Sequence, residues 1–454
     1  MIGPVTTVVD AEVEGTLTDV RLVGDRIDQI GPSLPRAGSE VVQAAGGALL
    51  PGLHDHHLHL FAMAARDRSL DVAAVEGADG FDRAVRDAHA AGHPTAWLRV
   101  VGYDESHGPL DAERLAALAP DRPVRVQHRT GAAWMLSPAA GRATGVAADG
   151  WQHREDERLA AAWDDGAPPD LRAVAARLAA AGVTGVTDAT PFTTPEGYAA
   201  LAAARTAGDL PQRVVVTGGP DLATTAAPDG LDLGPVKVVV ADHELPDPDD
   251  LAAQFALAHR AGRPVAVHCV TRVATVLAVV AWELAGAVDG DRVEHASVVP
   301  VELVGRLAAL GVQVVTQPAF VRAHGDRYLR TVEADDLPHL YRCASLLEAG
   351  IGVGGSTDAP FGPEDPWVAV AAAADRRTAG GAVLGADERV AAEVALGGFL
   401  SRPERPGGPA RQVVPGAAAD LVLLDGPLAT VLASPGSDHV AATWIGGRCV
   451  HRRI

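Results

Sequence analysis

The feature that most restricts the fold of this 454-residue chain is an alternation of two kinds of segment between about residues 51 and 400. Short valine-rich segments have the length of buried strands, and alanine-rich stretches such as 171–181 and 249–261 have the pattern of helices. Strand followed by helix, repeated many times, indicates a parallel sheet. At this length, a closed α/β barrel is the leading choice.

More segments qualify as strands than an eight-stranded barrel needs. The sequence leaves open which of Ala96–Val101 and Val124–His128 is internal, and likewise Arg213–Thr217 and Val236–Ala241. The other candidates are Val183–Asp188, Pro264–His268, Arg292–His295, Val312–Thr316 and Ile351–Ser356.

The two ends of the chain differ from this middle region. Residues 5–50 and 412–454 consist of short β-rich pieces separated by turn residues such as Gly24-Asp25 and Gly446-Gly447. The Pro- and Gly-rich stretch 403–416 is the clearest linker. We therefore expect one small β domain built from both termini.

Charge and cysteine content restrict the partners and the compartment. The chain has 38 Lys and Arg against 58 Asp and Glu, a formal charge of −20, which disfavours nucleic acid and anionic membranes. Its three cysteines contain no CxxC pair, and this sparse set fits a reducing compartment. We see no signal peptide and no apolar run long enough to span a membrane, so we expect a cytoplasmic protein.

Five segments of the middle region carry a side chain that can bind a metal ion at the end of an apparent strand. In an extended chain, residues two apart point to the same side, so His57 and His59 can address one ion together. Side chains at the carboxyl ends of barrel strands converge on one mouth, where enzymes of this fold place their chemistry. The candidate ligands are His57, His59, Lys237, His268, His295 and Asp358.

This donor set predicts metal-assisted hydrolysis. Imidazole and carboxylate ligands suit Zn²⁺, and Mn²⁺, Fe²⁺ or Ni²⁺ could use the same set. A bound divalent ion brings the pKa of its water from about 15.7 to about 7 and polarises a substrate carbonyl. A carboxylate beside the ion can take the proton from that water and pass it to a leaving amine.

Two further points concern side-chain direction. An unpaired lysine inside a barrel is costly, so we expect Lys237 to be modified, to contact metal or to form an ion pair, unless it points outward between helices. His54 and His56 alternate away from His57 and His59, which favours packing or supporting roles for them.

Taken in order, these segments resemble the amidohydrolase superfamily, and more closely its YtcJ-like subgroup, also called amidohydrolase 3. The resemblance covers nearly the whole chain. It implies a (β/α)8 TIM barrel over 51–411 and a small β-sandwich domain from 1–50 and 412–454. The motifs that carry it are Pro51–Leu60, His268 in HCVTRVA, Arg292–Ser297, Gln317-Pro318, Gly354–Pro360 and Pro415–Leu423.

The resemblance also implies a role for each ligand. His57 and His59 would bind the more buried ion, and His268 and His295 the second. Lys237 would correspond to the strand-four lysine, which in some members is carboxylated and bridges two metals. Asp358 would be both a ligand and the general base. Asp358 and Lys237 are the residues predicted to be catalytic.

The expected activity is hydrolysis of a carbon–nitrogen bond, amide or cyclic amide but not peptide, in a small molecule. Deamination, ester hydrolysis or decarboxylation on the same centre stay open, because specificity lies in loops. A non-catalytic scaffold is a weaker alternative, since every expected ligand type is present. The sequence leaves open the substrate, one ion or two, and whether the chain forms a homo-oligomer.

The substrate pocket departs from the family pattern. Ala132 stands where many members have a histidine, Leu136-Ser137 replaces Asn-Ser, and Asp242-His243-Glu244 follows Lys237 one residue later than the usual Asp-Gly loop. Positions near strand ends give the substrate-contact candidates Tyr103, His107, His128, Trp134, Phe320, Arg322 and His324.

Overall fold

The computed structural model describes residues 5–93, 96–131, 133–153, 168–191, 193–220, 222, 228–241 and 244–453. The chain divides into two compact units. Unit 1 contains residues 1–59 and 171–454, and unit 2 contains residues 60–170. Each unit is described here by itself.

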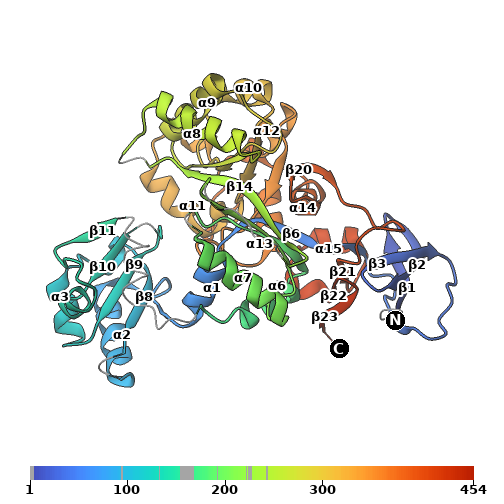
Figure 1. Cartoon of the computed structure of the whole chain (residues 1–454), viewed down its shortest axis with the longest axis horizontal. Helices are drawn as coiled ribbons and strands as arrows, with labels where there is room; N and C mark the ends of the chain where they lie inside the picture. Colours follow the sequence, from blue (N-terminus) through green and yellow to red (C-terminus); the bar gives the residue numbers. More distant parts are fainter. Residues whose placement is uncertain are drawn as a thin grey trace. The chain divides into compact units, whose positions relative to one another are not determined.

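The core of unit 1 is a sheet of eight parallel strands (Figure 1). Its order is β18-β17-β16-β15-β14-β13-β12-β6, so that after β6 each strand pairs with the next one along the chain. This arrangement confirms the predicted α/β fold of TIM-barrel type. The strands are β6 (Leu53–Leu58), β12 (Val183–Asp188), β13 (Arg213–Gly218), β14 (Leu231–Val239), β15 (Val265–Cys269), β16 (Arg292–His295), β17 (Gln313–Thr316) and β18 (Val353–Gly355).

The first and last strands meet just beyond their carboxyl ends. The backbone N–H of Asp358 donates to the carbonyl of His57 at 2.8 Å, and the N–H of His59 donates to the carbonyl of Ala359 at 2.8 Å. These two bonds join the chain after β18 to β6. The barrel is therefore closed at the same end as the predicted metal ligands.

Helices cover the outside of this sheet because the strands present apolar side chains there. Val236, Val238 and Val240 pack into one buried cluster with Phe255 of α8 and Trp282 of α9. Among the helices that the structure describes, none is long and apolar enough to cross a membrane. The helices of unit 1 are α6 (Arg172–Ala180), α7 (Pro195–Ala207), α8 (Pro248–Arg260), α9 (Arg272–Ala285), α10 (Val301–Leu310), α11 (Ala319–Thr331), α12 (Ala344–Glu348), α13 (Pro366–Asp375), α14 (Ala392–Leu400) and α15 (Leu428–Ala433).

The structure also settles which candidate strands are internal. Arg213–Thr217 and Val236–Ala241 both overlap barrel strands, β13 and β14. Neither Ala96–Val101 nor Val124–His128 lies in the barrel. Ala96–Val101 overlaps β8 and Val124–His128 is β9, and both belong to a five-stranded sheet in unit 2. The strands of that sheet are β7 (Leu70–Asp71), β8 (Leu98–Tyr103), β9 (Val124–His128), β10 (Ala133–Leu136) and β11 (Trp151–His153).

Unit 2 has its own hydrophobic core, in which Phe81, Leu115 and Val126 are fully buried. Residues 60–170 thus form a separate unit within the range 51–411 predicted for the barrel. The helices of this unit include α1 (Leu60–Asp67), α2 (Gly77–Ala91), α3 (Ala112–Leu118) and α4 (Pro138–Thr144).

The two chain ends share one core. Leu22 near the N-terminus and Leu421 and Trp444 near the C-terminus belong to the same buried cluster, and Figure 1 shows the red C-terminal strands beside the blue N-terminal ones. The boundaries 1–50 and 412–454 and the sandwich form stay predictions. The strands involved are β1 (Val5–Val13), β2 (Thr16–Val23), β3 (Arg26–Gly31) and β4 (Glu40–Gln43) in one sheet, and β5 (Leu49–Pro51), β21 (Leu421–Leu424), β22 (Val440–Ile445) and β23 (Arg448–Arg452) in the other.

Candidate metal centre

His57 is held by a carboxylate on the opposite side of the barrel. Its Nδ1 lies 2.5 Å from Oε2 of Glu294, and both side chains are almost fully buried. An ionised carboxylate can only accept a hydrogen bond, so Nδ1 carries the proton and Nε2 keeps its lone pair. That Nε2 lies 3.6 Å from Oδ1 of Asp358.

Asp358 is the point at which the candidate ligands converge. Its Oδ1 lies 3.2 Å from Nε2 of His59, and its Oδ2 lies 3.7 Å from Nδ1 of His295. Burial alone would raise the pKa of Asp358, but the hydrogen bond from His59 and the nearby His295 ring outweigh burial and hold that pKa well below its usual range. The carboxyl is therefore ionised.

His57, His295 and Asp358 form a cluster that could hold a metal ion. One donor atom from each lies within 4.8 Å of the others, and all three side chains are buried. Burial, followed by the charge of Lys237, lowers the pKa of His57 to about 3. A neutral imidazole is the form that binds a metal ion, so the electrostatics suit this role.

His268 and Lys237 lie on the strands next to this cluster. The ring of His268 is 4.5 Å from that of His295, measured between centroids. Lys237 is buried, and its Nζ has no hydrogen-bond partner among the residues that the structure describes. Burial lowers the pKa of Lys237. The lysine thus faces the barrel interior, as expected if it does not point outward between helices.

An unusual backbone conformation directs two of these side chains. His295 has φ 67° and Asp358 has φ 55°, both in the left-handed region that non-glycine residues rarely adopt. Strand alternation alone would turn His295 away from the barrel interior, because the preceding Glu294 faces inward. The left-handed turn brings His295 to the mouth, and such local strain is typical of functional sites.

Two more polar side chains support the ligands. Asp55 accepts hydrogen bonds from the backbone N–H of His57 at 3.1 Å and from the hydroxyl of Thr357 at 2.5 Å. Burial raises the pKa of Asp55 to about 7. Oε1 of Gln317 accepts a hydrogen bond from Nδ1 of His295 at 3.0 Å. Nδ1 then carries the proton, and Nε2 keeps the lone pair that a metal ion can bind.

Glu294, Asp55 and Gln317 were not among the site residues predicted from the sequence. Glu294 could have been found, because it is two residues from Arg292 on a strand and a buried acid requires a partner. Asp55 likewise precedes His57 by two residues on the same inward face. The role of Gln317 depends on the conformation of His295, which the sequence does not reveal.

His54 and His56 lie away from the cluster. Nε2 of His54 is 3.0 Å from the hydroxyl of Thr187, and Nε2 of His56 is 2.9 Å from the hydroxyl of Ser401. Both imidazoles are buried and hydrogen-bonded. These contacts agree with the packing role that alternation predicted for them.

The substrate-contact candidates of unit 1 fall into two environments. Phe320, at the start of α11, is buried, with its ring 5.2 Å from that of His324 and 5.8 Å from that of Tyr341. Arg322 forms an ion pair at 2.6 Å with Asp375 on α13. Arg322 is thus already engaged by a carboxylate, whereas Phe320 belongs to an aromatic cluster.

The remaining candidates lie in unit 2. The hydroxyl of Tyr103 donates to the carbonyl of Gly108 at 2.6 Å, and His128 pairs with Glu105 at 3.2 Å. Trp134 and His107 are buried within that unit. Their contact with a substrate stays a prediction. Of the positions that depart from the family pattern, Ala132, Asp242 and His243 lie outside the described residues.

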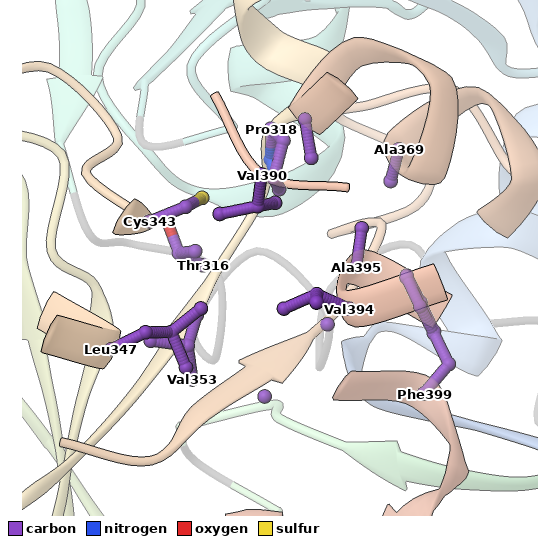
Figure 2. Close-up of a pocket in the computed structure, with 13 residues that line it drawn as sticks. Thr316, Pro318, Cys343, Leu347, Val353, Ala369, Val390, Val394, Ala395 and Phe399 are labelled. Atoms are coloured by element: carbon purple, nitrogen blue, oxygen red, sulfur yellow. The ribbon is translucent and has the colours of Figure 1, made fainter. Parts of the chain in front are cut away.

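A separate apolar pocket lies on the outer side of the barrel wall (Figure 2). Its lining comes mainly from β17, β18 and helices α12, α13 and α14, and none of the six predicted ligands is among its lining residues. The pocket is therefore distinct from the candidate metal centre. Labelled lining residues include Thr316, Cys343, Leu347, Val353, Val394 and Phe399.

The protein is therefore a parallel eight-stranded barrel with a candidate metal centre. Histidines and an aspartate form that centre at the carboxyl ends of the strands. The chain belongs to the amidohydrolase family, because the family model Amidohydro_3 (Amidohydrolase family) matches residues 40–451. The predicted resemblance is confirmed.

Named relatives agree with this assignment. The chain is 24% identical to an N-substituted formamide deformylase from Arthrobacter pascens, over 89% of this chain and 88% of that protein. It is 24% identical to YtcJ of Bacillus subtilis (strain 168), named as an amidohydrolase, over 75% of each chain. Among solved structures, a metal-dependent hydrolase from Pyrococcus horikoshii OT3 has a TM-score of 0.76 at 19% identity, covering 96% of this chain and 99% of that one.

We predict that His57→Asn lowers the metal content of the purified protein, while His56→Asn leaves it unchanged. Both imidazoles are buried on β6, but only His57 directs a nitrogen toward Asp358. Elemental analysis of the two folded variants checks this. Wild-type occupancy in His57→Asn would show that this histidine is not a ligand.

Proposed function

We propose that the protein is a metal-dependent hydrolase that cleaves a carbon–nitrogen bond, in an amide or cyclic amide other than a peptide, of a small molecule. The observation that carries this proposal is the buried cluster of His57, His295 and Asp358 at the carboxyl ends of the barrel strands. Membership of the amidohydrolase family supports it. So does the name of the Arthrobacter relative, because deformylation of a formamide breaks such a bond.

The donor set fits a divalent cation. Neutral imidazoles and an ionised carboxylate together suit Zn²⁺, and Mn²⁺, Fe²⁺ or Ni²⁺ accept the same donors. His57, His59 and Asp358 would hold one ion, and His268, His295 and Lys237 would complete a two-ion centre. When bound, such an ion supplies Lewis acidity, which activates water and polarises a carbonyl.

Asp358 is proposed to move the proton. Its carboxyl is ionised and lies against the ligand nitrogens of His57 and His59, so an attacking water at this point has a base within reach. Asp358 accepts the proton of that water and then donates it to the departing nitrogen. The leaving group therefore departs as a neutral amine and not as a poor amide anion.

The experiment that tests the proposed function combines metal removal with a substrate panel. We expect wild-type protein to hydrolyse at least one compound among N-acyl amino acids, N-substituted formamides, cyclic imides and lactams. Chelation should abolish this activity and Zn²⁺ or Mn²⁺ should restore it, because few donors hold the ion once one is lost. Full activity in protein shown to be free of metal would contradict the proposal. Turnover of esters or aminopurines alone would favour the alternative reactions.

We predict that Lys237 is carboxylated and bridges two ions. Its neutral Nζ attacks CO₂, the new N–C bond forms, and one proton leaves, which replaces a buried unpaired amine by a carbamate anion. Reconstitution of metal-free protein should then take up about two ions per chain with bicarbonate and about one without it. Lys237→Met should be insensitive to bicarbonate. Equal uptake in both conditions by the wild type would rule out the bridge.

We predict that Asp358→Asn lowers kcat by at least about 10²-fold, the lower end of general-base contributions, with a smaller change in KM. The substitution keeps the shape of the side chain but removes the basic oxygen. Steady-state kinetics of the metal-loaded variant measures this. Asp365→Asn is the matched control, because Asp365 caps α13 through the N–H of Trp367 and asparagine caps equally well. Turnover of Asp358→Asn within a few-fold of wild type would exclude Asp358 as the base.

A further inference from the structure

We propose that the buried pair of Arg292 and Glu294 positions His57 as a metal ligand, an inference that rests on the proposed metal site. Arg292 donates from Nε to Oε1 of Glu294 at 2.7 Å, and Oε2 of the same carboxylate lies 2.5 Å from Nδ1 of His57. The three side chains are between 0% and 1% exposed. They form one continuous hydrogen-bonded series in the buried interior of the barrel.

The two oxygens of Glu294 have different partners. A glutamate that served only to neutralise an arginine could direct both oxygens to the guanidinium, which is the strongest geometry for such a pair. Here one oxygen is used for the arginine and the other for the imidazole. Because Arg292 and Glu294 are two residues apart on β16, both side chains face the interior, and the arginine fixes the carboxylate from below the layer of the ligands.

The other histidines of the same strand provide an internal comparison. His54 and His56 are hydrogen-bonded to the hydroxyls of Thr187 and Ser401. The hydroxyl of Thr187 can donate or accept, so it does not select which nitrogen of His54 carries the proton, and neither partner is charged. A carboxylate accepts only, and therefore it sets both the tautomer and the rotation of His57. Within β6, this fixed partner occurs at the histidine that faces Asp358.

Burial of two opposite charges is not an efficient way to stabilise a fold. The desolvation of an arginine and a glutamate offsets much or all of their mutual attraction, so a buried pair gives weak evidence for a stabilising role. The Arg292–Glu294 pair does have a specific effect on geometry, because it holds the lone pair of His57 Nε2 toward Asp358. Carboxylates behind ligand histidines commonly orient the ring and contribute to metal affinity.

The test compares Glu294→Gln and Glu294→Ala with Glu388→Gln. Glu388 is the matched control, because it is also buried and paired with an arginine, Arg342, at 2.7 Å, outside the metal cluster. Zn²⁺ affinity is measured by competition with a chelator, and the visible absorption spectrum of the Co²⁺-loaded protein reports ligand geometry. The melting temperature of each metal-free variant is recorded in parallel.

We expect Glu294→Gln to weaken metal affinity by about 10- to 100-fold and to change the Co²⁺ spectrum. Glu294→Ala should weaken affinity at least as much, and Glu388→Gln should keep wild-type affinity and spectrum even if its melting temperature falls. Wild-type affinity in Glu294→Gln, or an equal loss in Glu388→Gln, would overturn the proposal. If Glu294→Ala does not fold, the near-isosteric Glu294→Gln still decides. These measurements use no substrate, so a protein that binds metal normally but hydrolyses nothing would contradict the proposed function alone.

Discussion

The geometry of the site depends on the backbone hydrogen bonds that close the barrel. The N–H of Asp358 donates to the carbonyl of His57, and this contact joins the last strand of the barrel to the first. Each of these residues is also a proposed ligand, so the contact that closes the barrel also holds two proposed ligands side by side. Asp55 reinforces this contact, since it accepts from the backbone of His57 and from the hydroxyl of Thr357. The left-handed conformation of Asp358 is stable because the closed barrel holds the chain on both sides.

The pattern of the sequence predicted the inward side chains, but it could not give the partners of each one. The sequence left open whether Lys237 points inward, and in the structure it lies on the same face of the sheet as His268, opposite Val236 and Val267. Alternation fails at His295, where a left-handed residue reverses the direction of the side chain. The contact of His57 with Glu294 joins residues 237 positions apart, and no local pattern reports such a contact.

The strands that could not be assigned from the sequence have a simple physical explanation. β8 and β9 contain buried valines, have ordinary strand length and are followed by polar turns, which are the same properties that identify a barrel strand. They pack in a second core of unit 2, and local hydropathy does not reveal which core a strand joins. Similarly, a position near a strand end suggested Arg322 as a substrate contact. Its guanidinium pairs with Asp375, a contact that depends on the neighbouring helix and that the sequence does not reveal, and its contact with a substrate stays a prediction.

Charge balance connects the proposed modification of Lys237 with metal binding. Burial and the Arg292 cation oppose protonation of Lys237, whereas the Glu294 and Asp358 carboxylates favour it. Both oxygens of Glu294 are already engaged, and Nζ of Lys237 has no hydrogen-bond partner among the described residues. Carboxylation would replace the amine of Lys237 by a carbamate anion, whose negative charge a divalent ion beside it would offset. In a buried site, where uncompensated charge is costly, the carbamate anion and a nearby divalent ion would stabilise one another, so carboxylation is expected to favour uptake of the second ion.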